Sequence, residues 1–141
     1  TTCGANGSAC SACGFGLKCE TGGCVFDETT MFKLTALEIA NCSCTDAIGL
    51  PDPFVTLQSP SSSASTNTCS DVVGCKFSSG SIDVTAGDLV AGKVTFHVYD
   101  EDTSFDDDCG GGAIKLPSPI VPATYEVSVG GQTFTFKVDA K

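Results

Sequence analysis

Apolar and polar residues alternate along several short stretches after residue 30, and a period of two predicts β-strands rather than helices. The stretches are MFKLTALEIA at 31–40, PFVTLQ at 53–58, KVTFHVYD at 93–100 and YEVSVGGQTFTFKVD at 125–139. No long segment repeats apolar residues at the helical period. Several short strands separated by turns predict an all-β fold, an antiparallel β-sandwich, over residues 31–141.

Two of these stretches carry further detail. The run at 31–40 predicts a strand that contains a bulge. The run at 125–139 has Gly130 and Gly131 at its centre, and two residues that tolerate positive φ predict a two-residue hairpin turn there. We therefore expect two adjacent antiparallel strands at the end of the chain.

Position 97 holds the one histidine of the chain. It alternates with Phe96 and Val98, so its side chain is expected to face away from theirs as an ordinary residue of the sheet surface. The stretch SPSSSASTNT at 59–68 is polar and of low complexity, and it predicts a loop.

The segment before the strands, residues 1–26, has a different composition. It holds five cysteines and six glycines and has almost no periodic apolar pattern. Such a segment cannot build a core, so cross-links are expected to hold it, either as a disulfide knob or as a stapled linker. The rest of the chain also has five cysteines, so at least one bridge must join the two parts if all ten are paired.

An even number of cysteines at this density is typical of disulfides and of an oxidising compartment, which predicts a secreted or extracytoplasmic protein. The competing interpretation is zinc. Cys10 and Cys13 have ligand-like spacing, but Cys19 and Cys24 follow too soon, because zinc ribbons usually separate their pairs by about 15–20 residues. The spacing therefore favours disulfides.

The chain is strongly acidic, with 17 acids, 7 bases and a formal net charge of −10. This charge excludes nucleic acid as a partner, because phosphate binding needs Lys and Arg to displace counterions. It also argues against simple electrostatic attachment to anionic lipid. The sequence contains no run of 18 apolar residues that would predict a membrane span. Cations are the natural partners of such a chain.

Acidic residues are most crowded in VYDEDTSFDDDCGG, residues 98–111, where six acids occupy the nine positions from Asp100 to Asp108. An EF-hand loop starting at Asp100 fails, because Phe105 stands where the loop needs Gly and Gly111 stands where a bidentate Glu belongs. A solvent-exposed loop without a ligand is the simplest alternative, since most runs of charged residues are of this kind.

A second stretch, CTDAIGLPDPFVTL at 44–57, changes this picture. Its Asp46 and Asp52 are six residues apart, and Asp52 opens a D-P-F-V strand start. Together with VYDEDTSFDDDCGG, it resembles the C2 domain family in its calcium-binding form. The resemblance covers about residues 31–141 and implies a C2-type β-sandwich. It implies that two loops at one end of the sandwich hold calcium through five aspartates: Asp46, Asp52, Asp100, Asp102 and Asp108.

Calcium suits these residues, because it takes 6–8 oxygen ligands and several aspartates on two loops can share two or three ions. The chain departs from the family in lacking its N-P-x-W segment and the basic patch that many members use for phosphoinositides. A nucleophile–base pair and a phosphate cradle are also not visible, so the sequence does not predict an enzyme. The expected function is a calcium-binding, disulfide-braced secreted binding module, with calcium-dependent docking to a phospholipid membrane as the alternative. An extracellular protein is the other expected partner.

Three apolar residues bear on that alternative. The resemblance places Ile48 and Leu50 at the tip of the first loop and Phe105 at the tip of the third. They are expected either to pack against each other or to insert into a membrane.

The resemblance also predicts disulfides, because the first and third loops must converge if their aspartates share an ion. Either Cys42 or Cys44 is then expected to pair with Cys109, and the other to reach back to the N-terminal segment. Cys69 and Cys75 are expected to close their own short loop.

Overall fold

The computed structural model of the chain describes residues 13–20, 22–44, 48–103 and 105–141. Most of these residues lie in β-strands, and a short helix, α1 (Ala86–Ala91), is the helix among them. The strands are β1 (Leu17–Glu20), β2 (Gly23–Phe26), β3 (Met31–Ala40), β4 (Pro53–Gln58), β5 (Ser63–Ser65), β6 (Cys75–Lys76), β7 (Ser81–Thr85), β8 (Val94–Asp100), β9 (Asp107–Ile114), β10 (Ala123–Val129) and β11 (Gln132–Ala140).

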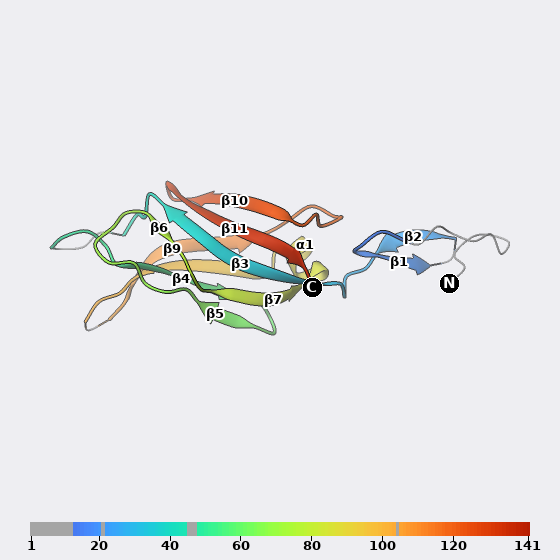
Figure 1. The fold of residues 1–141 in the computed structure, drawn as a ribbon, viewed down its shortest axis with the longest axis horizontal. Helices are drawn as coiled ribbons and strands as arrows, with labels where there is room; N and C mark the ends of the chain where they lie inside the picture. The colour runs from blue at the N-terminus through green and yellow to red at the C-terminus, as the bar shows by residue number, and fades with distance from the viewer. Residues whose placement is uncertain (1–12, 21, 45–47, 104) are drawn as a thin grey trace.

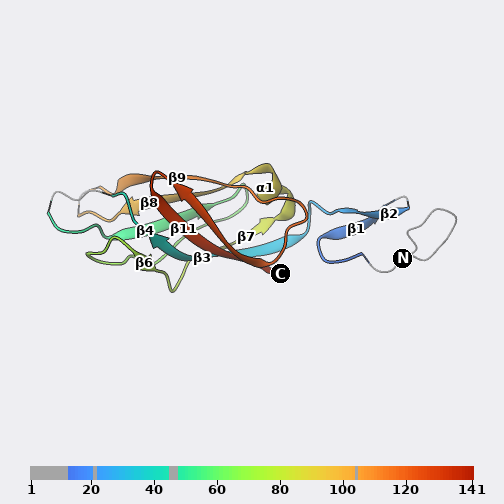
Figure 2. The same ribbon diagram turned by 90° about the horizontal axis from the view of Figure 1, so that it is seen from above.

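Strands β3 to β11 form two antiparallel sheets that face each other, as Figures 1 and 2 show from two directions. One sheet has the order β10-β11-β3-β6, with β7 also paired to β3, and the other has the order β5-β4-β8-β9. The predicted all-β sandwich is confirmed. Its four alternating stretches correspond to β3, β4, β8 and the β10–β11 hairpin, with Gly130 and Gly131 both at positive φ in the turn.

The core lies between the two sheets, where the inward residues of each strand meet. Phe96 of β8 stacks on Phe134 of β11 with 4.7 Å between ring centroids, so aromatic packing joins the sheets at their centre. His97 lies on the outer side of β8, as expected from its alternation with buried neighbours. The largest fully buried apolar side chains are Phe32, Leu34, Ile39, Val55, Leu57, Val84, Leu89, Phe96, Ile114, Phe134 and Phe136.

Strand β3 contains the predicted bulge. Its buried positions are Phe32, Leu34 and Ala36 and then Ile39, so the alternation changes phase near the end of the strand. The register with β11 shifts at the same place, where Thr135 faces Glu38 but Phe136 faces Ala36. One extra residue lets both halves of β3 bury their apolar side chains, which a regular strand could not do.

The polar stretch 59–68 is not a loop throughout. Residues 63–65 form β5, which pairs with Thr56 to Gln58 at the edge of the second sheet. A composition of serine and alanine hides such a strand, because edge pairing uses backbone groups and few buried side chains. Helix α1 was also not predicted. Thr85 caps its start by accepting a hydrogen bond from the Asp88 amide at 3.1 Å.

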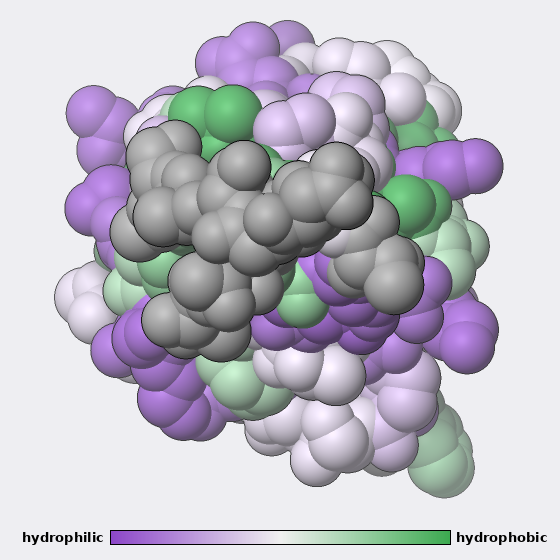
Figure 3. All heavy atoms as spheres, turned by 90° about the vertical axis from the view of Figure 1, so that its right-hand side faces the viewer, coloured by the Kyte–Doolittle hydropathy of each residue, from purple (hydrophilic) through white to green (hydrophobic). Residues whose placement is uncertain are grey.

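In the described part of the N-terminal segment, β1 and β2 form an antiparallel hairpin, and the disulfide Cys13–Cys24 ties the residues before β1 to β2. Phe15 contacts the sandwich edge-on at Phe32, with 5.2 Å between ring centroids. The hairpin lies beyond the end of the sandwich that carries α1 and the C-terminus, and the loops rich in acids lie at the opposite end (Figure 1). Figure 3 looks onto the hairpin end, where hydrophilic and hydrophobic side chains are interspersed around the grey atoms.

Nowhere in the described part of the chain is there a helix with the length and apolar character needed to span a bilayer.

Strand β9 lies so close to β8 that its glycines are required. A Cβ atom on Gly111 would overlap the carbonyl oxygen of Phe96 and lie 2.8 Å from the Cα atom of His97, both backbone atoms that cannot turn aside. The neighbouring Gly110 has φ +95 and stands in a bulge, where β9 has one residue more than β8.

We predict that Gly111→Ala lowers the free energy of unfolding by about 1–3 kcal/mol or more, because the methyl group must displace the backbone of β8. Gly23→Ala is the matched control, since no atom lies within 4 Å of the Cβ position there and φ is ordinary. Urea denaturation of both variants measures the difference. Equal stability of the two variants would show that β8 and β9 are less tightly apposed than described here.

Candidate metal centre

Asp100 ends strand β8 on the inward side, directly in line with the buried Val94, Phe96 and Val98. Its side chain is only 2% exposed. One carboxylate oxygen, Oδ1, accepts a hydrogen bond from the Asp52 amide at 2.6 Å, whereas the buried Oδ2 has no hydrogen-bond partner. A buried carboxylate oxygen without a partner is costly, and a cation is the ligand that would offset this cost.

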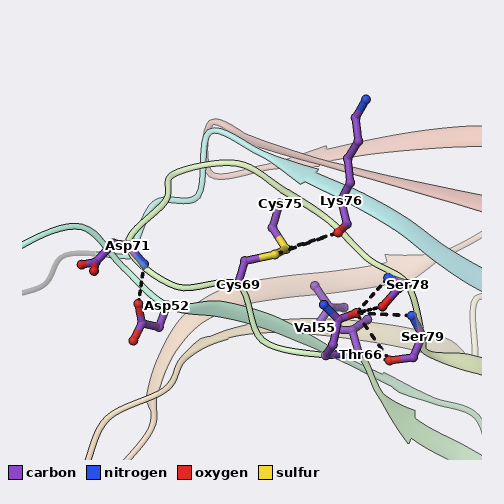
Figure 4. Close-up of a disulfide and its surroundings, with 10 residues drawn as sticks. Asp52, Val55, Thr66, Cys69, Asp71, Cys75, Lys76, Ser78 and Ser79 are labelled. Atoms are coloured by element: carbon purple, nitrogen blue, oxygen red, sulfur yellow. Dashed lines mark hydrogen bonds between the residues drawn. A yellow bond between two sulfur atoms is a disulfide. The ribbon is translucent and has the colours of Figure 1, made fainter.

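Asp52 connects the loop before β4 to the loop after β8. Its amide donates to Asp100, and its carbonyl accepts a hydrogen bond from the Glu101 amide at 3.1 Å. Its own carboxylate is half-buried and accepts a hydrogen bond from the Asp71 amide at 2.6 Å. Figure 4 shows this last contact, from the backbone nitrogen of Asp71 to a carboxylate oxygen of Asp52. Three loops are therefore joined through two aspartates.

The structure adds Asp71 to the acids expected from the sequence. It lies in the loop closed by the Cys69–Cys75 disulfide, adopts φ +54 and is exposed. A Cβ atom on Gly49 would lie 3.3 Å from Asp71 Oδ1, so this carboxylate reaches the first loop. The resemblance assigned no acid to this loop. The signal that could have found it is an acid between two closely spaced cysteines, which must lie near the bridge.

Asp108 takes a different direction from Asp100. It faces Tyr99 in the sheet, and its Oδ2 lies 3.7 Å from Nδ1 of His97, so its side chain is on the outer face of β8 and β9. Its Oδ1 accepts a hydrogen bond from the Gly110 amide at 2.9 Å. Asp107 is the residue opposite Asp100, and directly opposed residues point to the same face. In this register, Asp107 rather than Asp108 shares the face of the buried carboxylate.

The remaining acids complete the loop end. Asp102 is exposed, and its amide donates to Oδ1 of Asp106 at 3.3 Å, which curls the third loop back on itself. Asp46, the fifth expected ligand, lies outside the described residues. Within the described ranges, no three carboxylates bring their oxygens within 4.8 Å of one another. The aspartates there are linked through backbone amides.

A disulfide between Cys44 and Cys109 connects the first loop to the third, with 5.0 Å between the Cα atoms. The structure thus contains the bridge expected from the convergence of these loops, and Cys69–Cys75 closes its own short loop as expected. Figure 4 shows the latter disulfide beside the carbonyl oxygen of Lys76.

The expectation for Cys42 was wrong. It does not reach back to the N-terminal segment but carries a free thiol, only 8% exposed, in the core at the loop end. The β1–β2 hairpin lies beyond the other end of the sandwich, out of reach of Cys42 (Figure 1). Burial raises the pKa of the Cys42 thiol above its ordinary value, and the nearby Asp100 carboxylate acts in the same direction.

Gln132 holds the loops from the other sheet, and the sequence analysis did not single it out. Its side chain is 1% exposed and lies at the start of β11. Its Nε2 donates to the carbonyl oxygen of Cys109 at 3.0 Å, and its Oε1 accepts from the Ser43 amide at 3.2 Å. The amide group thus supports both sides of the disulfide.

The apolar loop tips are exposed. Ile48 is 89% exposed and Phe105 is 85% exposed, while Leu50 and Val73 are each 49% exposed. These four residues come from the same three loops as the acids, so the end of the sandwich combines a buried carboxylate with apolar side chains in solvent.

The loop length that each disulfide closes predicts how much it stabilises the fold. Cys44–Cys109 spans 65 residues and Cys69–Cys75 spans 6. From loop entropy, we predict that Cys44→Ala with Cys109→Ala lowers the free energy of unfolding by about 4 kcal/mol, and Cys69→Ala with Cys75→Ala by about 2 kcal/mol. Urea denaturation of the two double variants measures both losses. A larger loss from the short loop would contradict the prediction.

Solved structures of C2 domains share this fold. Human GIVD cytosolic phospholipase A2, in complex with methyl gamma-linolenyl fluorophosphonate and terbium chloride, aligns at 20% identity and TM-score 0.62 over 77% of this chain and 17% of that chain. A calcium-bound fragment of extended-synaptotagmin 2 with two C2 domains aligns at 13% identity and TM-score 0.63 over 81% of this chain and 46% of that chain. A structure described as a C2 domain aligns at 17% identity and TM-score 0.58 over 79% and 99% of the two chains.

These likenesses establish the fold, which is that of a C2-type β-sandwich. No protein-family model and no curated protein matches the sequence. The chain corresponds to less than half of the phospholipase and of the extended-synaptotagmin fragment.

Proposed function

We propose that this chain is a calcium-binding module whose metal centre lies at the end of the sandwich that carries Asp52 and Asp100. The observation that carries the proposal is the Asp100 carboxylate, which is 2% exposed and has an oxygen without a hydrogen-bond partner where three loops meet. No basic side chain is paired with it in the described residues. A hard cation that prefers carboxylate oxygens fits this environment.

Asp52, Asp100 and Asp102 supply oxygens from the first and third loops, and the resemblance adds Asp46 and Asp108. Asp71 is a further candidate, because its amide donates to the Asp52 carboxylate (Figure 4) and its own carboxylate reaches the first loop at Gly49. In the third loop, the strand register makes Asp107 the better candidate calcium ligand, because Asp107 lies opposite Asp100. The carboxylate of Asp108 instead faces His97. Calcium would draw these carboxylates together and offset their mutual repulsion.

The disulfides support a proposal for the compartment. Three disulfides join described residues: Cys13–Cys24, Cys44–Cys109 and Cys69–Cys75. Disulfides persist in oxidising environments, so we propose that the chain works as a secreted or extracytoplasmic binding module. Extended-synaptotagmin 2, one of the structural neighbours, has been solved with calcium bound, which supports the metal assignment. The region matched in phospholipase A2 is 17% of that enzyme, too little to suggest catalysis here.

Calcium should stabilise the protein. At about 100 times the dissociation constant, one ion adds roughly 2.7 kcal/mol, which raises the melting temperature by on the order of 10 °C relative to EDTA. In Asp100→Asn this shift should be lost. Without calcium, however, the variant should melt at or above the wild-type temperature, because a buried unpaired charge has been removed. Thermal melts with and without calcium test both statements.

Three further variants sharpen the assignment. The variants Asp107→Asn and Asp108→Asn test the two candidate ligands of the third loop separately. The strand register predicts that the calcium-induced rise in melting temperature decreases more in Asp107→Asn than in Asp108→Asn. Glu126→Gln, an exposed acid on β10, is the control and should keep the full shift. Identical wild-type melting temperatures in EDTA and in excess calcium would refute the metal centre.

A second candidate function is calcium-dependent docking to phospholipid membranes. It is favoured by the exposure of Ile48 and Phe105 at the tips of the loops that carry the acids. The net charge is −10, and two calcium ions of charge +2 each would leave −6. Docking must therefore rely on apolar insertion, or on calcium bridging to zwitterionic headgroups, more than on attraction to anionic lipid.

If docking occurs, Ile48→Ser with Phe105→Ser should abolish binding to phosphatidylcholine vesicles while leaving calcium affinity nearly unchanged. Each buried apolar side chain contributes roughly 1.5–3 kcal/mol, so the loss of two is decisive. Val121→Ser, 58% exposed in the segment between β9 and β10, is the control and should bind normally. Co-sedimentation with and without calcium measures binding, and unchanged binding by the double variant would exclude insertion of these tips.

A further inference from the structure

Three cysteine sulfurs meet beneath the acidic loops. The Sγ atoms of Cys42, Cys44 and Cys109 all lie within 4.8 Å of one another. Cys44 and Cys109 form the disulfide between the first and third loops, and Cys42 has a free thiol. The Sγ of Cys42 lies 2.9 Å from the Sγ of Cys44. A thiol is therefore held in contact with one particular sulfur of a disulfide.

The contact is built into the fold. The Cys42 amide donates to the carbonyl oxygen of Val73 at 2.7 Å, which anchors Cys42 to the loop closed by Cys69–Cys75. The preceding Asn41 has φ +54, so the chain turns sharply between β3 and Cys42. Cys42 and Cys44 are 8% and 9% exposed, whereas Cys109 is half-buried. The two neighbouring sulfurs are shielded from external reagents, and Cys109 is the most accessible of the three.

We propose that Cys42 opens the disulfide between the two loops by intramolecular thiol–disulfide exchange. The Cys42 thiol loses its proton, and its sulfur attacks the Sγ of Cys44. A Cys42–Cys44 bond forms, the Cys44–Cys109 bond breaks, and its electron pair leaves with the sulfur of Cys109, which takes up a proton. One thiol and one disulfide are present before and after, so the step needs no external oxidant or reductant.

The geometry selects Cys44 rather than Cys109 as the sulfur attacked. A disulfide bond is about 2.0 Å long, so the 2.9 Å separation of Cys42 and Cys44 must close by about 0.9 Å. Attack at Cys109 would form Cys42–Cys109 and leave the loops joined. Attack at Cys44 instead moves the bridge entirely into the first loop and frees the third.

Opening the bridge changes what holds the two loops together. In the bridged structure the Cys109 carbonyl accepts hydrogen bonds from Gln132 and Ser43 at 3.0 and 3.2 Å, and after exchange no covalent bond would support these contacts. The freed Cys109 presents a thiol next to Asp108. The exchanged form would then bind calcium more weakly. This consequence rests on the proposed calcium function, but the exchange itself is independent of that function.

Thiol labelling of the native full-length chain tests the exchange. The protein, isolated without reductant, is incubated with N-ethylmaleimide, quenched with acid, unfolded, and digested without reduction for mass spectrometry. The expected product carries the label on Cys109 and a bond between Cys42 and Cys44. In Cys42→Ala, the label on Cys109 should be lost and Cys44–Cys109 should stay intact.

Every other labelling pattern overturns the proposal. Label on Cys42 with Cys44–Cys109 intact would show an ordinary thiol, and label on Cys44 would show attack at the wrong sulfur. A thiol that reacts only after unfolding would show that no exchange occurs. The wild-type pattern alone decides the question if Cys42→Ala does not fold. Calcium titration of the same preparation is a separate readout, so the absence of calcium binding would leave the labelling result valid.

Discussion

The organisation of the loop end depends on one constraint, the burial of the Asp100 carboxylate in line with an apolar strand face. Strand β8 places Val94, Phe96 and Val98 in the core, and the next inward position holds a carboxylate that is 2% exposed. Its first oxygen orients Asp52 through a short hydrogen bond, and Asp52 in turn orients Asp71. Burying a charge beside this core is tolerable only if it is paired.

A second group of contacts holds the loops in place around that carboxylate. The Gln132 side chain donates a hydrogen bond to the Cys109 carbonyl and accepts one from the Ser43 amide, so it contacts both sides of the Cys44–Cys109 bridge. Gln132 belongs to the opposite sheet. Gly111 lets β9 lie directly against the backbone of Phe96 and His97. Much of the ordering entropy of the loops is thereby removed before any ligand binds.

The fold is shared with C2 domains at identities of 13–20%, and two further features of this chain bear on the loops and the opposite end of the sandwich. A β1–β2 hairpin with its disulfide packs on the end of the sandwich away from the acids. The free thiol of Cys42 lies in contact with the bridge between the loops. The first feature adds a surface remote from the acidic loops, and the second places a thiol beside the covalent link between those loops.

The sequence by itself determined the all-β class, the main strands, the turn at Gly130 and Gly131 and the bulge in β3, because alternation and turn chemistry are properties of neighbouring residues. It also predicted the pairing of Cys109 with one of two cysteines. Short edge strands such as β5 escaped it, since backbone pairing with a distant strand leaves little trace in composition.

The tertiary structure alone decided how the site is arranged. Cys42 and Cys44 are equivalent in sequence, but only the folded loops place Cys44 within bonding distance of Cys109. Asp71 and Gln132 join the site from segments distant in the chain. One additional residue in β9 turns Asp108 toward His97 and sets Asp107 opposite Asp100. Side chains alternate between faces with a period of two, so a bulge of a single residue reverses which acid shares the face of the buried Asp100 carboxylate, and that reversal depends on pairing with another strand.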